Sequence, residues 1–314
     1  MVTLNSVKNQ TNREKGVIVA HYGVAVDVRF ESDGQTKMVR VKRNSGHVVG
    51  DNVKVDDEVL TRLERESELC RRDARGGIHI VGANLDVLSI VVCCEPLPPP
   101  GFIDRAIVAA RANYLQPTIL VNKSDLPCFT TYAQETYALY QDSVPCFSLS
   151  AESGDGLQAL TDFFSKGRRG IFVGPTGVGK SSLLNTMLPE LNLQTGEISE
   201  TKKRGKNTTT VSTLHSLPTG GELIDSPGFN DFGLVDVSAL ELAAHFPGFE
   251  QANNSYCRFR DCKHQQEPGC AVTELVSEKI IDRERYTTYL HILTEVEAME
   301  AEPKYREKRN RRKK

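Results

Sequence analysis

The sequence lacks the long hydrophobic runs that membrane and secreted proteins need. Its longest mostly apolar stretch, LSIVVCC at 88–94, is far shorter than the roughly 20 residues that span a bilayer. The first residues, MVTLNSVKNQTNREKG, contain no apolar core of a secretory signal. These absences exclude the transmembrane and secreted classes, and they predict a cytoplasmic protein that does not contact a membrane.

Disulfide bonds are not expected either. The chain has 314 residues and eight cysteines, and thiols usually stay reduced in cytoplasmic proteins. The cysteines therefore indicate free thiols and a candidate metal site rather than a disulfide framework.

Apolar residues make up 39% and charged residues 25% of the chain, values that are typical of a soluble protein with two or three globular domains.

Charge is unevenly distributed along the chain. The last twelve residues, PKYREKRNRRKK, contain eight Lys or Arg and one Glu, a net charge of +7, so the total of −2 leaves −9 for the rest. A cationic tail on an acidic body indicates contact with a polyanion such as RNA. A disordered, solubilising tail would have the same composition, and charge alone does not separate the two.

Aromatic residues are scarce in the N-terminal segment, where only Tyr22 and Phe30 are available for base stacking. Apolar and polar residues alternate over 16–60, the period of half-buried strands, which predicts a small antiparallel barrel such as an oligonucleotide-binding (OB) fold. Four cationic residues give one edge of it positive charge: Lys37, Arg40, Lys42 and Arg43. Nucleic-acid binding at this edge and simple solvation of its charges both remain open.

From about residue 80 the pattern changes to an α/β class. The apolar runs DVLSIVVCC, PTILVNK, PCFSLSA and RGIFVGP alternate with helix-like segments such as FIDRAIVAARANYL and DGLQALTDFF. This alternation predicts a parallel sheet covered on both faces, with ligands bound beyond the carboxyl ends of its strands. We expect three domains: a barrel at 1–72, a nucleotide-binding domain at 73–235 and a helical domain at 236–314.

A phosphate-binding loop is the strongest motif. GPTGVGKS at 174–181 fits G-x-x-x-x-G-K-[ST], follows the apolar run GIFV and opens the helix-like run SSLLNTML. Lys180 would neutralise the β- and γ-phosphates, and Ser181 would bind Mg²⁺. A glycine-rich turn before Lys-Ser is the alternative, but the flanking strand and helix favour a phosphate site. The expected nucleotide contacts are Gly174, Pro175, Thr176, Gly177, Val178, Gly179, Lys180, Ser181 and Ser182.

Two further stretches are typical of a guanine-reading site. In VNKSD, Asp125 can accept from the ring N–H and the exocyclic amine of guanine, a donor pair that adenine lacks. Asn122 would hold the loop and Lys123 would lie along the base. In SLSAESG, the Ala151 N–H would reach the guanine carbonyl and Ser150 would shape the loop. Each tetrapeptide alone is compatible with an incidental turn, but both follow an apolar run, which favours one shared site.

The order of these loops is reversed relative to an ordinary GTPase, in which the phosphate loop comes first. Further on, ELIDSPGF places Asp225 at a strand end, where it suits a second Mg²⁺ contact through water, and Gly228 N–H could contact a γ-phosphate. Although D-x-P-G alone is a common turn, here it follows a phosphate loop. Because a pocket needs loops that converge in space rather than in chain order, the pattern indicates a circularly permuted domain.

A Cys/His cluster follows the nucleotide-binding segment. Its spacing is C-x4-C-x-H-x5-C, and three thiolates with one imidazole make a closed tetrahedral zinc site with a structural role. The four residues are Cys257, Cys262, His264 and Cys270. Free cysteines beside a surface histidine are the alternative. The other five cysteines do not cluster and are expected to be core or incidental residues: Cys70, Cys93, Cys94, Cys128 and Cys146.

The order NKSD, SA, GPTGVGKS, DSPGF and then C-x4-C-x-H-x5-C resembles that of the circularly permuted ribosome-small-subunit-dependent GTPases (RsgA, also called YjeQ) over nearly the whole chain. The resemblance implies an OB-fold barrel, a permuted GTPase domain with a mostly parallel sheet, and a helical domain with one structural Zn²⁺. It also implies Mg²⁺-dependent GTP hydrolysis, stimulated by the ribosome, in late maturation of the 30S subunit. The implied partners of this monomer are GTP, GDP, the 30S subunit and its 16S rRNA.

One segment departs from the family pattern. RGKNTTT at 204–210 has Asn207 where the family usually has His before the three threonines. By position, Thr209 would contact Mg²⁺ and the γ-phosphate. Phe229 stands where Ras-like proteins place a water-orienting Gln, and Phe cannot orient water. Asn207 can hydrogen-bond a water but cannot accept a proton near neutral pH, so it is either a water-positioning residue or only a flexible loop residue.

The sequence therefore predicts a GTPase. Its expected catalytic residues are Lys180, Thr209, Asp225 and Asn207, and its expected Mg²⁺ ligands are Ser181, Thr209 and Asp225. The alternative is a nucleotide-gated rRNA-binding assembly factor with negligible turnover, which Asn207 and Phe229 keep open. An ATPase of similar architecture is a third option, and NKSD argues against it.

Overall fold

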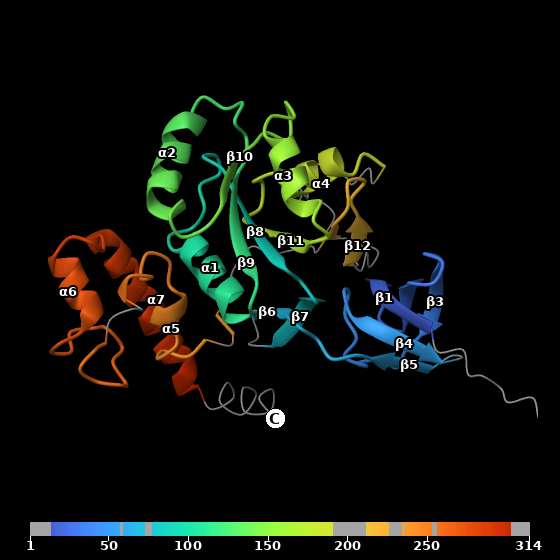
Figure 1. Ribbon diagram of the computed structural model, residues 1–314, viewed down its shortest axis with the longest axis horizontal. Helices are drawn as coiled ribbons and strands as arrows, with labels where there is room; N and C mark the ends of the chain where they lie inside the picture. Colours follow the sequence, from blue (N-terminus) through green and yellow to red (C-terminus); the bar gives the residue numbers. More distant parts are fainter. Residues whose placement is uncertain are drawn as a thin grey trace, which may run out of the picture.

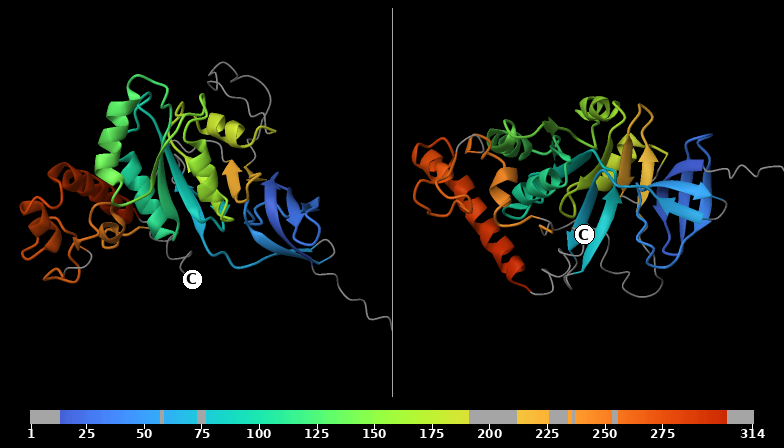
Figure 2. Two further views of the ribbon diagram at one scale, coloured as in Figure 1. Left: turned by 45° about the horizontal axis from the view of Figure 1, so that its top comes forward. Right: turned by 60° about the horizontal axis from the view of Figure 1, so that its bottom comes forward.

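The computed structural model describes residues 14–56, 59–72, 77–190, 212–225, 234–235, 237–252 and 256–302. Three units lie in a row (Figure 1): an antiparallel barrel, an α/β domain in the middle, and a helical unit at the other end. The two further views in Figure 2 agree on this order. The predicted α/β class with a mostly parallel sheet is confirmed.

The barrel is built from five antiparallel strands in the order β3–β2–β1–β4–β5. They are β1 (Glu14–His21), β2 (Ala25–Phe30), β3 (Thr36–Arg40), β4 (Asn52–Asp56) and β5 (Val59–Arg62). Alternate residues point inward, so that Ile18, Val26 and Val53 are fully buried, as the period of two in the sequence requires. The cationic Lys37 and Arg40 lie on the exposed strand β3.

The strands of the α/β domain have the order β10–β9–β8–β11–β13–β12 and are parallel except for β12, which is antiparallel to β13. Its strands are β8 (Val87–Val92), β9 (Gln116–Val121), β10 (Cys146–Ser148), β11 (Arg169–Val173), β12 (Thr213–Ser216) and β13 (Glu222–Asp225). Its helices are α1 (Phe102–Ala112), α2 (Phe129–Tyr140), α3 (Leu157–Phe164) and α4 (Lys180–Met187). This alternation of strands and helices brings the carboxyl ends of the parallel strands to one edge of the sheet.

The central strand β8 is buried along its whole length. Leu88 and Ile90 belong to the core that includes α1 and α2, whereas Val87 and Val91 belong to the core that includes α3 and α4. Successive side chains of a strand point to opposite faces, so this division shows that both faces of the sheet are covered. The sequence prediction of a doubly covered sheet is confirmed.

The barrel and the α/β domain share a continuous sheet. Strand β12 pairs with β13 on one side and with β1 of the barrel on the other, where Ala20 lies opposite Thr213. Glu222 on β13 is bonded both to Arg169, at 2.7 Å between Nε and Oε2, and to Arg29 of the barrel. One carboxylate between two guanidinium groups therefore bridges the two units.

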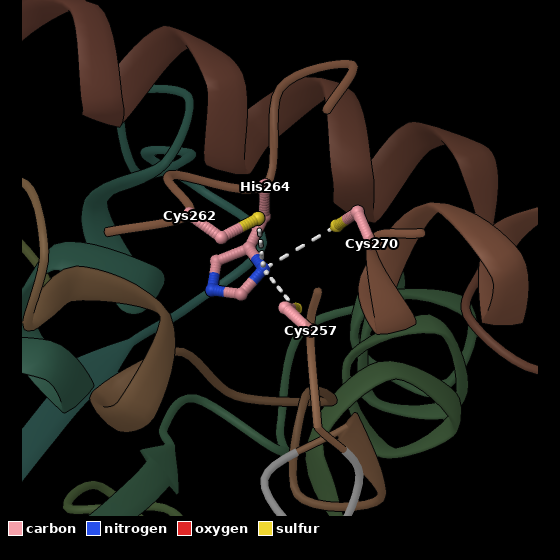
Figure 3. A group of neighbouring side chains, drawn as sticks. All are labelled: Cys257, Cys262, His264 and Cys270. Carbon is pink, nitrogen blue, oxygen red and sulfur yellow. Dashed lines mark hydrogen bonds between the residues drawn. The ribbon is translucent and has the colours of Figure 1, made fainter. Parts of the chain in front are cut away.

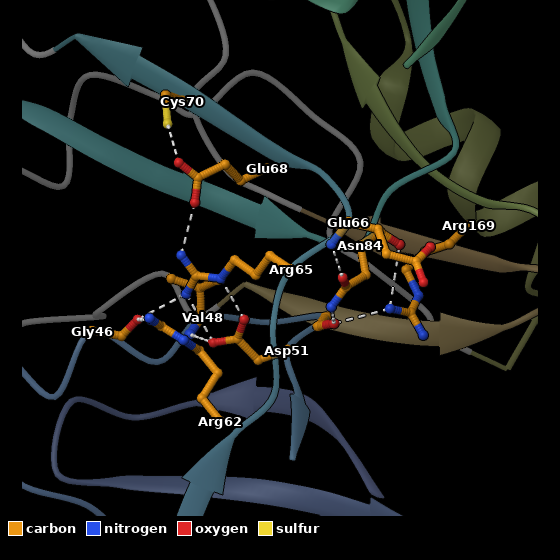
Figure 4. Close-up of polar contacts among 11 residues, drawn as sticks. Gly46, Val48, Asp51, Arg62, Arg65, Glu66, Glu68, Cys70, Asn84 and Arg169 are labelled. Carbon is orange, nitrogen blue, oxygen red and sulfur yellow. Dashed lines mark hydrogen bonds and ion pairs between the residues drawn. The ribbon is translucent and has the colours of Figure 1, made fainter. Parts of the chain in front are cut away.

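A second group of polar contacts lies where the chain passes from the barrel into the α/β domain (Figure 4). The carboxylate of Asp51 is fully buried and accepts from Arg65 Nε at 2.6 Å. The carbonyl oxygen of Gly50 accepts from Asn84 Nδ2 at 2.8 Å and from Arg169 Nη1 at 2.9 Å. The last two bonds satisfy the buried backbone carbonyl of Gly50 at the junction. A two-stranded antiparallel sheet links the units: β6 (Glu68–Arg72) and β7 (Ile78–Ala83).

The C-terminal unit is helical, as the sequence predicts. Its helices are α5 (Leu242–His245), α6 (Ala271–Ser277) and α7 (Arg283–Ala301). The helical structure breaks between α6 and α7, where the Asp282 side chain caps α7 by accepting from the backbone N–H groups of Glu284 and Arg285. Within the described ranges, no helix combines the length and apolar character needed to cross a membrane.

Helix α7 holds the helical unit against the α/β domain. Its buried Tyr289 ring packs at 4.9 Å from Phe249 and 5.2 Å from Phe246, measured between centroids. Near the start of α7, Arg285 Nη1 lies 3.0 Å from Asp104 Oδ1 on α1, and both side chains are 7% exposed. The aromatic rings thus pack within the helical unit, and the buried ion pair joins this unit to the α/β domain.

Candidate functional site

The phosphate loop runs from the end of β11 to the start of α4, the strand–loop–helix context that its motif requires. The backbone of Gly174 passes so close to β8 that an added Cβ would lie 2.2 Å from the carbonyl oxygen of Val91. Lys180 opens α4, and its Nζ donates to the carbonyl oxygens of Gly174 (2.6 Å) and Pro175 (2.7 Å). The Lys180 ammonium is therefore bonded to the backbone at the start of the predicted phosphate-binding loop.

Asn122 connects the phosphate loop with the two guanine stretches. Its side chain is 1% exposed; Nδ2 donates to the carbonyl oxygen of Val178 at 2.8 Å, and Oδ1 accepts from Ala151 N–H at 3.2 Å. Thr186 of α4 also donates to the carbonyl oxygen of Ala151, at 3.1 Å. Loops that follow β9, β10 and β11 are therefore joined at one edge of the sheet. The guanine contact expected of Ala151 N–H would share that N–H with Asn122.

The carboxylate of Asp125 is held by the side chain of Ser150. Ser150 Oγ donates to Asp125 Oδ1 at 2.5 Å, and the same Oγ accepts from the N–H groups of Glu152 and Ser153, both at 3.1 Å. Asp125 itself is exposed. An exposed carboxylate whose orientation is set by a buried hydroxyl suits the recognition of a paired donor group.

Lys123 has a positive φ of 66°, and its Nζ donates to the carbonyl oxygen of Glu95 at 2.7 Å. Glu95 lies in the loop that follows β8, and Pro96 in the same loop lies beside Gly177, where an added Cβ would be 3.5 Å from the proline ring. No sequence motif marks this loop as part of a nucleotide site. The only indication was its position directly after β8, the strand that lies between β9 and β11 in the sheet.

Asp225 ends β13, next to the phosphate strand β11. Burial raises the pKa of its carboxyl, while the nearby charges of His215 and Lys180 act in the opposite direction. Burial also lowers the pKa of Lys180 to about 8, against the attraction of Asp225. The two groups thus share one half-buried environment. His215, which the sequence analysis missed, lies on β12 with Nε2 2.7 Å from Thr213 Oγ1.

The donor set for Mg²⁺ consists of hard oxygens, which this ion prefers. Ser181 lies in the first turn of α4. Asp225 is the last residue of β13, the strand next to β11 in the sheet. These residues fit a magnesium ion held with nucleotide phosphates. The other residues predicted for this site lie outside the described residues: Asn207, Thr209 and Gly228.

The expectation that the cysteines form no disulfide is wrong. Cys94 and Cys128, which the sequence analysis treated as core or incidental residues, form a disulfide with their Cα atoms 6.0 Å apart. They are separated by 34 residues in the chain, but they lie on the loops after β8 and β9, which are neighbours in the sheet. The sequence could not show this pairing, because it depends on which strands are adjacent.

The four residues of the Cys/His motif do come together (Figure 3). The Sγ atoms of Cys257, Cys262 and Cys270 lie 3.5, 3.7 and 3.4 Å from His264 Nδ1. Ordinary zinc bond lengths in a tetrahedron place sulfur and nitrogen ligands about 3.6 Å apart, so the group fits one ion. Tyr286 OH donates to the backbone oxygen of His264 at 2.8 Å, which helps to hold the loop.

The sheet, the converging loops and their scrambled chain order define a circularly permuted GTPase fold. The model of the family described as RsgA GTPase matches residues 62–235. A protein of Pseudomonas fluorescens called small ribosomal subunit biogenesis GTPase RsgA is 39% identical over 296 residues, covering 89% of this chain and 85% of that protein. The chain belongs to the RsgA GTPase family.

Other relatives support the same assignment. A Chromohalobacter salexigens protein with the same name is 39% identical over 290 residues, covering 88% of this chain and 85% of its own length. The crystal structure of YjeQ from Thermotoga maritima has a TM-score of 0.74 at 30% identity and covers 90% of this chain and 98% of that chain. The structure of YloQ, a circularly permuted GTPase, has a TM-score of 0.68 at 25% identity and covers 94% and 98%.

Proposed function

We propose that this chain hydrolyses GTP to GDP and phosphate and acts in the late maturation of the small (30S) ribosomal subunit. The observation that carries the proposal is the junction at Asn122, which bonds the guanine loop to the phosphate loop through Val178 and to Ala151 of the third loop. A base and a triphosphate bound across such a junction contact all three loops at once. The names of the relatives supply the ribosomal role.

The residues of the site then take separate roles. Asp125, oriented by Ser150, selects guanine, while Lys123 lies along the base and Asn122 holds the loops together. The backbone from Gly174 to Ser182 wraps the phosphates, and Gly228 contacts the γ-phosphate. When bound, Mg²⁺ neutralises charge that develops on the phosphates.

Lys180 stabilises the charge on the β- and γ-phosphates, as expected for a phosphate-loop lysine. Among the described residues, Ser181 and Asp225 would hold Mg²⁺, and Thr209 would complete the proposed set. The water-positioning role of Asn207 is a hypothesis based on its place in the switch segment. Unchanged 30S-stimulated turnover in Asn207→Ala would remove it from the mechanism.

The flanking units would bind the ribosome. We propose that the barrel (1–72) and the helical domain (236–314) contact 16S rRNA and that the GTPase domain (73–235) lies between them. One structural Zn²⁺, held by Cys257, Cys262, His264 and Cys270, would stabilise the helical domain. The protein would act as a cytoplasmic monomer.

The decisive experiment measures phosphate release under multiple turnover, with and without purified 30S subunits, together with co-sedimentation on 30S subunits. The proposed function predicts turnover that rises with 30S subunits, and binding that differs between GDP, GTP and a non-hydrolysable GTP analogue. Nucleotide-dependent 30S binding without turnover would instead support the assembly factor that Asn207 and Phe229 leave open. Absence of guanine-nucleotide binding would refute both.

A further inference from the structure

The Cys94–Cys128 disulfide lies at the carboxyl edge of the sheet, where the nucleotide loops converge. Cys94 follows the end of β8, and Cys128 directly precedes α2 at the end of the guanine loop. The bridge therefore ties together the loops that follow two neighbouring parallel strands. A cross-link between two binding loops restricts their motion relative to each other.

The loop bridged at Cys94 contacts both halves of the nucleotide site. The carbonyl oxygen of Glu95, the next residue, accepts from Lys123 Nζ at 2.7 Å. Pro96 lies against Gly177 of the phosphate loop. Glu95 and Pro96, which directly follow Cys94, thus contact the guanine loop and the phosphate loop respectively. Forming or breaking the bridge at Cys94 therefore affects both loops.

Exposure makes this pair chemically accessible. Cys128 is exposed and Cys94 is half-buried, and disulfides in such positions are more often labile or regulatory than structural. Cys93, by contrast, is fully buried; its thiol lies 3.1 Å from the carbonyl oxygen of Glu95, and burial raises its pKa. Burial also raises the pKa of Cys146 to about 11, so neither of these thiols competes readily for oxidants.

We propose that Cys94 and Cys128 form a reversible redox-modification site that controls how fast guanine nucleotide leaves the site. In the oxidising direction the two thiols lose two protons and two electrons as the S–S bond forms, and one hydrogen peroxide is reduced to two waters. In the reducing direction a dithiol supplies two electrons and two protons and itself becomes a disulfide. In a cytoplasmic protein such disulfides are usually transient rather than permanent.

The bridged form holds nucleotide longer. It keeps the Glu95 carbonyl beside Lys123 and Pro96 beside Gly177 before the nucleotide arrives, so less loop freedom is lost on binding. Differences in affinity between two forms of one binding site appear mainly in the dissociation rate of the ligand. Oxidation therefore slows GDP release, and reduction speeds exchange. This inference rests on the proposed guanine-nucleotide site.

The test follows dissociation of a fluorescent GDP from the full-length, zinc-loaded chain after treatment with equimolar hydrogen peroxide or with dithiothreitol. Intact mass and peptide mapping first establish that peroxide forms the Cys94–Cys128 bridge. The bridged protein is expected to release GDP about three- to tenfold more slowly than the reduced protein. Cys94→Ser and Cys128→Ser should release GDP at the reduced rate under both treatments, and Cys146→Ser should respond like the native chain.

Several results would overturn the proposal. If peroxide does not form the bridge, the proposed redox site is refuted. If the bridged and reduced forms release GDP at equal rates, its effect on nucleotide release is refuted. Neither result would contradict the proposed GTP site. A peroxide response that persists in Cys94→Ser would assign the effect to another group, such as the zinc thiolates, whose metal content is measured in parallel. A chain that binds no guanine nucleotide in either state would refute this inference and the proposed function together.

Discussion

Gly179 of the phosphate loop lies directly against Asn122 of the guanine loop. A Cβ added at Gly179 would lie 2.3 Å from Asn122 Nδ2, and the backbone there has a φ of 96°. The neighbouring carbonyl of Val178 accepts from that same Nδ2. Two loops that are more than fifty residues apart in the chain therefore meet at a point where only glycine fits.

The first prediction follows from this contact. Gly179→Ala should weaken GTP binding by at least about tenfold, because the methyl group displaces Asn122 and separates the loops. Gly167→Ala is the matched control, since Gly167 also has a positive φ (78°) but its added Cβ would meet nothing within 4 Å. The control should lose about 1 kcal/mol of stability and keep its GTP affinity by calorimetry. Equal losses of affinity would show that the loops are not coupled here.

Base selection should depend on the carboxylate of Asp125. Asp125→Asn replaces an acceptor by an amide that meets the guanine donors with a donor of its own, so GTP affinity should fall about a hundredfold or more. Affinity for xanthosine triphosphate should rise in the same variant, because the xanthine carbonyl matches the new amide. Asp162→Asn, on the exposed face of α3, should leave both affinities unchanged. Retained selectivity for GTP in Asp125→Asn would refute the base-reading role.

Binding of GTP should weaken above neutral pH. Burial lowers the pKa of Lys180 to about 8, and only the ammonium form attracts phosphates, which stay ionised in this range. The protonated fraction falls as pH rises through that pKa, so affinity should drop about threefold from about pH 7.5 to about pH 8.5. Lys180→Ala should bind weakly and without this pH dependence. A flat profile in the native chain would contradict the assignment.

Loss of one zinc ligand should affect the helical unit more than the nucleotide site. Cys270→Ser opens the ligand set directly before α6, where Ala271 N–H also donates to Cys257 Sγ at 3.3 Å. Metal content should fall from about one Zn²⁺ per chain, and the melting temperature should fall by roughly 5 °C or more. Cys146→Ser should keep its zinc. Elemental analysis and calorimetry test this, and full zinc content in Cys270→Ser would exclude Cys270 as a ligand.

The buried ion pair between Asp104 on α1 and Arg285 on α7 should contribute more to stability than the more exposed ion pair between the same helices. Asp104→Ala leaves Arg285 and the Tyr140 hydroxyl, which donates to Asp104 Oδ2 at 2.9 Å, without their buried acceptor. The expected loss is about 3–5 kcal/mol in the free energy of unfolding. Glu295→Ala breaks the more exposed pair with Arg105 between the same helices and should cost about 1 kcal/mol or less. Denaturant titration compares the two, and similar losses would argue against a buried-charge effect.

Much of the fold could be predicted because strand and helix patterns are local. The period of two in the barrel strands and the alternation of buried runs with helices follow from neighbouring residues, and both are confirmed. The switch residues Asn207 and Thr209 lie outside the described residues, so their roles stay predictions.

The sequence by itself determined the strands, the helices, the permuted order of the motifs and the spacing of the Cys/His ligands, because each depends on residues close together in the chain. Only the tertiary structure decided what lies beside what. Asp104 and Arg285 are 181 residues apart, Arg29 and Glu222 are 193 apart, and Cys94 reaches Cys128 across two neighbouring loops. Such contacts arise from the packing of whole elements, which local patterns do not encode.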